Sequence, residues 1–152
     1  EGDIARRLCP TLNAIYTDQM IFSTITFSKP GLDDLTPAET DDAITGLNCA
    51  KWVISWLPSF GSAKFGGEPI AEDWGYAVRV SVGPDTFLLG IASAFEDDAN
   101  RWRIMVGDNL NRGLLPWTQR RRRGEAVRLS DFVERSLRHA DGVTNVQVER
   151  NG

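Results

Sequence analysis

The sequence predicts an α+β domain in which a five-stranded, mainly antiparallel sheet carries two helices on one of its faces. Two observations support this prediction. Segments that alternate between apolar and polar residues recur along the chain, and two segments with helical spacing interrupt them. The expected order is therefore strand, helix, three strands, helix, strand. We expect residues 1–19 to form an N-terminal arm or extension and residues 20–150 to form a single domain.

Five segments have the alternation or the β-branched composition that is typical of strands. The segment 20–28 is rich in isoleucine, threonine and phenylalanine, and the segment 76–82 alternates valine with smaller or polar residues. The turn residues Gly83-Pro84-Asp85 predict a hairpin after the second of these segments. The predicted strands are residues 20–28, 76–82, 86–94, 101–106 and 143–149.

Two segments show the start signals and the spacing of helices. The first begins at Thr36, which can cap exposed amide groups, and it ends at Pro58, which cannot continue a helix. The second is predicted to begin at Ser130 as a cap. Residues 107–124, which lie between the fourth predicted strand and this helix, are predicted to form a long irregular connection.

Composition limits the classes of function that the chain can have. The net charge of −4 at pH 7 opposes general nucleic-acid binding, which needs a positive excess. Cys9, Cys49 and His139 are the only cysteine and histidine residues, and they are too scattered for a structural zinc site. We expect two free thiols in a cytoplasmic protein. No metal, cofactor or membrane segment is predicted, because no phosphate-binding glycine motif and no long apolar run occurs.

The first candidate site is the segment Glu72-Asp73-Trp74-Gly75, directly before the strand 76–82. Two carboxylates can act as general acid and base when their surroundings separate their pKa values. Adjacent residues of an extended segment point in opposite directions, however. A structural turn explains the same residues if Asp73 bonds backbone amides, Trp74 packs against the sheet and Gly75 permits the bend. A ligand contact and a structural turn both remain as interpretations.

The second candidate site combines Trp117 with the run Arg120, Arg121, Arg122 and Arg123. Adjacent guanidinium groups can bind phosphates or an acidic partner. A run of like charges is more commonly a solvated loop. The acidic turn at residues 96–98 is expected to offer these arginines a partner, either within the chain or in a neighbouring molecule.

Four segments of the chain support a resemblance. They are Thr26–Gly31, Pro69–Tyr76, Trp102–Ile104, and Gly142 with the residues Val143–Val146 after it. Together they resemble a family of small bacterial proteins without an assigned activity, and the similarity covers most of residues 21–150. Its distinctive motif is Glu-Asp-Trp-Gly, and Tyr76 stands where members often have a second tryptophan. The resemblance implies a compact bacterial α+β domain and supplies no catalytic residue.

These observations favour a non-enzymatic module that binds another protein or a second copy of itself, in the manner of an immunity protein. One alternative is a small enzyme or ligand-binding protein with a pocket beside Glu72 and Asp73. Another is a nucleic-acid accessory domain that uses Arg120–Arg123. Trp52 and Trp56, four residues apart, are expected to share a helix face and are one candidate surface for self-association. The other is the sheet face expected to hold Arg79, Ser81, Gly90, Ala92, Arg103, Thr24 and Thr26.

Overall fold

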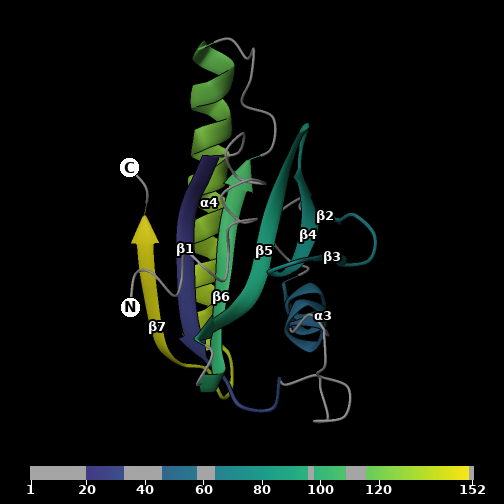
Figure 1. Cartoon of the computed structure of the whole chain (residues 1–152). Coiled ribbons are helices and arrows are strands. Elements are labelled where there is room, and N and C mark those ends of the chain that lie inside the picture. Colours follow the sequence, from purple (N-terminus) through teal and green to yellow (C-terminus); the bar gives the residue numbers. More distant parts are fainter. Residues whose placement is uncertain (1–19, 33–45, 58–63, 96–97, 109–115, 151–152) are drawn as a thin grey trace.

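The computed structural model describes residues 20–32, 46–57, 64–95, 98–108 and 116–150. Within these ranges the chain forms two helices and one seven-stranded sheet (Figure 1). Neither of these helices combines the length and the apolar character needed to cross a membrane. The elements in chain order are β1 (Met20–Ser28), α3 (Leu47–Trp56), β2 (Lys64–Phe65), β3 (Ile70–Glu72), β4 (Gly75–Val82), β5 (Asp85–Phe95), β6 (Asp98–Asp108), α4 (Pro116–His139) and β7 (Thr144–Arg150).

The strand β1 lies inside the sheet, although it comes first among the described strands. The spatial order is β2-β4-β5-β6-β1-β7, and β3 pairs with the beginning of β4. Ile25 of β1 lies opposite Ile104 of β6 on one side and Val148 of β7 on the other. Every pair of neighbouring strands is antiparallel, so the predicted α+β class with an antiparallel sheet is confirmed.

The predicted number of five strands is wrong, because the structure adds β2 and β3. These strands contain two and three residues, which is too short for an alternating pattern to show in the sequence. Ile70 of β3 is 41% exposed, so this strand also lacks the buried apolar position that would mark it in the sequence. Both short strands pair with the outer edge of β4.

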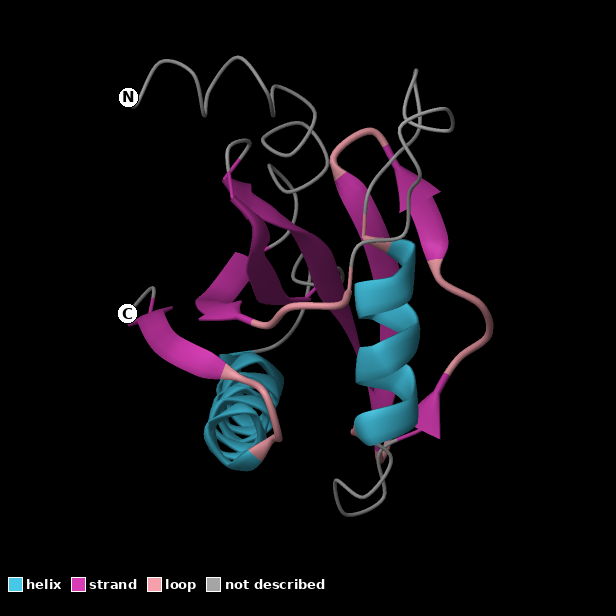
Figure 2. Cartoon of the chain, turned by 90° about the horizontal axis from the view of Figure 1, so that it is seen from below, coloured by secondary structure: helices cyan, strands magenta, loops and turns pink. Residues whose placement is uncertain are grey.

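Both helices pack against the same apolar face of the sheet, as the sequence predicted. One continuous cluster of buried side chains contains residues from the inner strands together with residues from α3 and α4. In Figure 2 the long helix α4 is seen end-on and α3 from the side, so the two helix axes differ strongly in direction. The helix residues in this cluster are Cys49, Ala50, Val53, Leu57, Ala126, Leu129, Val133 and Leu137.

The helix α4 begins at Pro116, well before the predicted start at Ser130. The run Arg120–Arg123 is therefore helical, and the prediction of an irregular connection up to residue 124 is wrong. Proline suits the first position of a helix, and arginine, glutamine and glutamate favour helical conformation. The sequence hid this part of the helix because its inward-facing position is the charged residue Arg122.

Ser130 lies inside α4 and does not cap it. Its side chain is 2% exposed, and its Oγ lies 2.6 Å from the Oγ of Ser23 on β1. This buried hydrogen bond satisfies both hydroxyl groups, which would otherwise destabilise the core. It also links α4 to β1.

The described part of the first helix is α3, with Gly46 before its first residue at a φ of 116°. The predicted start at Thr36 and the stop at Pro58 lie outside the described residues. Trp52 and Trp56 stack with their ring centroids 4.7 Å apart, as their spacing on one helix face predicted. Cys49 is a buried thiol of α3, and Cys9 lies outside the described residues.

The sheet face opposite the helices holds the small and polar residues that the sequence predicted for it. Thr26, Arg103 and Ala92 lie opposite one another across β1, β6 and β5. This face is not polar throughout, which differs from the prediction. A second buried cluster lies on it and consists of Trp74, Ala77, Ala92 and Met105, with Ile21 packed beside them.

Candidate functional site

The two groups of predicted site residues lie at opposite ends of β4. The segment 72–75 comes directly before β4, and Asp85, which binds Arg121 and Arg122, lies just past the turn at its end. A strand of eight residues spans about 26 Å. The structure therefore does not combine the two groups into one site, and residues 72–75 and the arginine run are two separate candidate sites.

The segment 72–75 forms a tight hairpin between β3 and β4. Glu72 lies opposite Gly75, so Asp73 and Trp74 are the two turn residues. Trp74 is 8% exposed and packs on the sheet face with Ala77, Ala92 and Met105. Asp73 is exposed, whereas Glu72 is half-buried. These positions match the structural interpretation of the segment more closely than a paired acid and base.

Gly75 is required by the close approach of two backbones. A Cβ atom at this position would lie 2.2 Å from the carbonyl oxygen of Ile91 on β5. Its φ of 158° is also rarely adopted by other residues. The glycine therefore lets the hairpin fold down onto β5, and this contact places the ring of Trp74 against the sheet.

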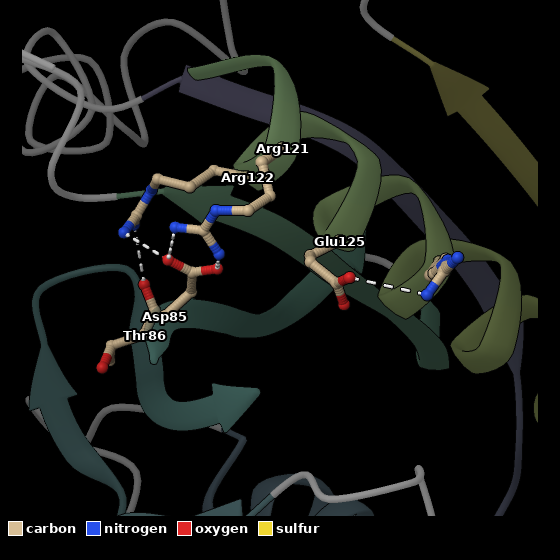
Figure 3. A network of polar contacts seen from close by, with 6 residues as sticks. Asp85, Thr86, Arg121, Arg122 and Glu125 are labelled. Atoms are coloured by element: carbon tan, nitrogen blue, oxygen red, sulfur yellow. Dashed lines mark hydrogen bonds and ion pairs between the residues drawn. The ribbon is translucent and has the colours of Figure 1, made fainter. Parts of the chain in front are cut away.

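Two residues of the arginine run, Arg121 and Arg122, bind the sheet through the carboxylate of Asp85 (Figure 3). Arg121 donates two hydrogen bonds to this carboxylate, from Nη1 to Oδ2 at 2.5 Å and from Nη2 to Oδ1 at 3.0 Å. Arg122 donates from Nη1 to Oδ1 at 3.1 Å and from Nη2 to the carbonyl oxygen of Thr86 at 3.3 Å. The guanidinium of Arg122 also lies over the ring of Phe87 at 5.6 Å.

Asp85 and Arg122 form a buried ion pair, since they are 2% and 5% exposed. A buried charge is costly unless it is paired and hydrogen-bonded, and both conditions are met here. Removing one partner of such a pair typically destabilises a protein by about 3–5 kcal/mol. The ion pair therefore fixes the N-terminal part of α4 against the beginning of β5.

Sequence reasoning missed Asp85 as the partner and treated it only as a turn residue. Residues 96 and 97 of the expected partner, the acidic turn at residues 96–98, lie outside the described residues, so that pairing stays a prediction. A signal for Asp85 was nevertheless present. It shares the alternation of Phe87 and Leu89, both of which face the core, and a carboxylate at an inward position needs a buried cation.

The exposed residues around this anchor form a surface that we name the α4 basic surface, made of Trp117, Arg120, Arg121 and Arg123. Trp117 is 62% exposed, and the side chain of Arg121 is 48% exposed despite its bonds to Asp85. Arg120 and Arg123 are exposed and form no ion pair with any described residue. In Figure 1 this end of α4 extends past the ends of the strands.

The charges on the rest of α4 and on the adjacent strand β7 are largely balanced by ion pairs. At the N-terminal end of the helix, by contrast, Arg121 and Arg122 share the carboxylate of Asp85, and the exposed Arg120 and Arg123 form no ion pair with a described residue. Hydrogen bonds to Asp131 and Glu134 raise the pKa of Arg150 above its ordinary value. The ion pairs of this balanced region are Arg128–Glu125, Arg138–Glu134, Arg150–Asp131 and Arg150–Glu134.

The remaining titratable candidates lie apart from both groups. His139 is the last residue of α4 and is exposed. Within the described ranges, no group of three or more histidine, cysteine, aspartate or glutamate side chains could hold a metal ion.

Comparison with known proteins identifies no family for this chain. No protein-family model, no curated protein and no solved structure matches the chain.

Proposed function

We propose that this chain is a non-enzymatic binding module that docks an acidic protein through the α4 basic surface. The observation that supports this most directly is the exposed ring of Trp117 beside guanidinium groups that the rest of the described fold does not neutralise. Tryptophan and arginine are among the residues that most often dominate the energy of protein interfaces. A rigid helix fixed by a buried ion pair also presents them with little loss of entropy on binding.

The partner that fits this surface has carboxylate groups around an apolar depression. The carboxylates would pair with Arg120, Arg121 and Arg123, and the depression would take the ring of Trp117. Complementary charge speeds the encounter of two proteins and suppresses wrong partners. An immunity protein that covers an acidic surface of its target would act in this way.

The two alternatives have weaker support. An enzyme at Glu72 and Asp73 would need a pocket there, yet Trp74 of the same hairpin packs against the sheet. A nucleic-acid accessory domain would use the same arginines, but the net charge of −4 repels phosphates at longer range. Peptide selection and oligonucleotide binding, measured on the same variants, separate a protein partner from a nucleic acid.

Selection of random peptides against the purified protein tests the proposal. We expect the selected peptides to be acidic and to contain an aromatic or aliphatic residue. The variant Trp117→Ala/Arg120→Ser/Arg123→Ser should lose these peptides, because it removes the ring and two of the exposed charges. The variant Arg135→Ser/Arg138→Ser is the matched control, since it removes two exposed charges from the other end of the same helix.

Equal loss of the peptides in both variants would indicate a general charge effect and would contradict the proposed surface. Selection of peptides without acidic residues would contradict the proposed partner. Fluorescence anisotropy with oligonucleotides, performed on the same variants, identifies a nucleic-acid partner if binding weakens steeply with salt.

Self-association is a separate expectation that the same protein can test. The half-buried, stacked rings of Trp52 and Trp56 and the sheet face opposite the helices are the surfaces for it. The α4 basic surface is unsuited to symmetric pairing, because two copies would repel each other. Light scattering at micromolar concentration should give the mass of a dimer, and a monomer mass would remove this expectation.

A further inference from the structure

Arg121 and Arg122 bind the same carboxylate, but they hold it under different conditions. Arg122 is buried, and its Nη2 is also bonded to the carbonyl oxygen of Thr86. The side chain of Arg121 is 48% exposed, and both of its Nη atoms donate to Asp85. Both guanidinium groups contact the carboxylate of Asp85, and the exposed one, Arg121, is the one that can leave.

We propose that Arg121 is an exchangeable arginine, which Asp85 holds in the free protein and which a carboxylate of the acidic partner takes over on binding. This inference rests on the proposed function and adds to it how the site is regulated. Asp85 then acts as an internal competitor that shields Arg121 until a partner arrives.

The geometry explains why the release of Arg121 from Asp85 costs little free energy. When Arg121 leaves, Oδ1 of Asp85 keeps its hydrogen bond from Nη1 of Arg122, and the negative charge remains paired. Water can reach Oδ2 from the side that Arg121 vacates. Because Arg122 keeps the buried Asp85 paired, a second carboxylate can replace Asp85 at Arg121 without leaving a buried charge unpaired.

The exchange also defines the ligand chemistry. Arg121 binds Asp85 through two parallel hydrogen bonds, a geometry that suits a planar carboxylate. A partner carboxylate must reproduce both bonds to displace Asp85. A weak or badly placed anion fails to compete, so Asp85 adds selectivity as well as shielding.

A synthetic oligoglutamate peptide is the probe, and its affinity is measured by fluorescence anisotropy at low salt. Arg121→Gln should weaken binding. Asp85→Asn/Arg122→Met should strengthen it about two- to fivefold, because Arg121 no longer has a competitor. The double variant is used because Asp85→Asn alone would leave the buried Arg122 without its counter-charge and could prevent folding.

A thermal melt of the single variants gives a second measurement that needs no ligand. Arg121→Gln should shift the midpoint by less than about 4 °C, whereas Arg122→Gln should lower it by about 6 °C or more. Equal losses would overturn the exchange, because Arg121 would then be a structural residue. If the wild type binds the peptide and Arg121→Gln binds it equally well, the exchange is overturned while the proposed function stands.

Absence of peptide binding by both the wild type and the double variant would overturn the proposed function, and the exchange with it. Binding by the double variant alone would support the competition by Asp85 in its strongest form. Inorganic phosphate, tested as a competitor at matched ionic strength, should displace the peptide only weakly. Displacement as strong as that by free glutarate would overturn the preference for a carboxylate.

Discussion

The two tryptophans at the predicted sites have opposite environments, although both stand beside charged residues in the sequence. Trp74 is 8% exposed and packs against the sheet, whereas Trp117 is 62% exposed on the solvent side of α4. The difference arises from the local backbone of each residue. Gly75 folds the hairpin of Trp74 onto β5, while Trp117 lies in a helix whose buried positions face away from it. An aromatic residue beside charges is therefore not enough to identify a binding surface.

The charges of the two regions differ in the same way. Glu72 and Asp73 belong to the hairpin between β3 and β4. The packing of Trp74 and the close contact of Gly75 in this hairpin give the segment a structural role. Arg120 and Arg123 are exposed and form no ion pair with a described residue, so the contacts of the described fold do not account for them. A feature that stability does not explain is the better candidate for function, so α4 is a better candidate than the hairpin.

The strongest way to test this comparison is to add one methyl group in each region. Gly75→Ala should destabilise the protein by about 3 kcal/mol or more, because the Cβ atom would lie 2.2 Å from the oxygen of Ile91. Gly124→Ala in α4 should stabilise it by about 0.5–1 kcal/mol, since the site is open and helical. Urea unfolding measures both. A tolerated Gly75→Ala would mean that the hairpin does not need its close contact.

Removal of the two rings is the next largest effect. Trp74→Ala should cost about 3–5 kcal/mol, because a buried ring leaves a cavity. Trp117→Ala should change stability by less than about 0.5 kcal/mol, as an exposed substitution does. Thermal melts of the two variants decide the matter. An unchanged midpoint for Trp74→Ala would make the hairpin a binding site and would reverse the comparison.

The arginine run should give no measurable binding of short single- or double-stranded oligonucleotides near physiological salt. The acidic balance of the whole chain opposes the attraction of phosphates, and one of the four arginines is buried. Fluorescence anisotropy at two salt concentrations checks this expectation. Micromolar binding that falls steeply with salt and is lost in Arg120→Ser/Arg123→Ser would move the nucleic-acid function to first place.

The smallest effect is expected in the balanced region beside the C-terminal half of α4. Arg150→Ala should destabilise the protein by only about 0–1 kcal/mol, because its pairs with Asp131 and Glu134 are partly exposed. High salt should reduce the difference further. Urea unfolding at two salt concentrations measures it, and a loss above about 2 kcal/mol would contradict the view of these pairs as surface contacts.

The sequence predicted the long elements of the fold because their patterns are local. Alternation in residues 76–82 and 101–106 and apolar spacing after Ser130 each depend on neighbours within a few positions. The strands β2 and β3 are too short for a pattern, and they exist only because β4 offers them an edge. The first half of α4 was missed because an arginine occupies its inward position.

The candidate site was predicted in its residues but not in its arrangement. Trp117 and Arg120–Arg123 were identified from composition, whereas their helical state and their anchor were not. The bond between Asp85 and Arg121 joins residues far apart in the chain, and no local pattern encodes such a pairing. The burial of Trp74 was one of two interpretations that the hairpin sequence allowed, and only the packed sheet distinguishes them.

The position of β1 between β6 and β7 has a consequence for how the protein is made. During synthesis β1 emerges before both of its neighbours, since Ile25 pairs with Ile104 and Val148. The hairpins of β4, β5 and β6 join segments close in sequence, so we expect them to assemble first. Until β6 and then β7 leave the ribosome, β1 is an apolar segment with two unpaired edges, the kind of segment that aggregates or recruits chaperones. Premature termination before β7 would leave one of these edges open permanently.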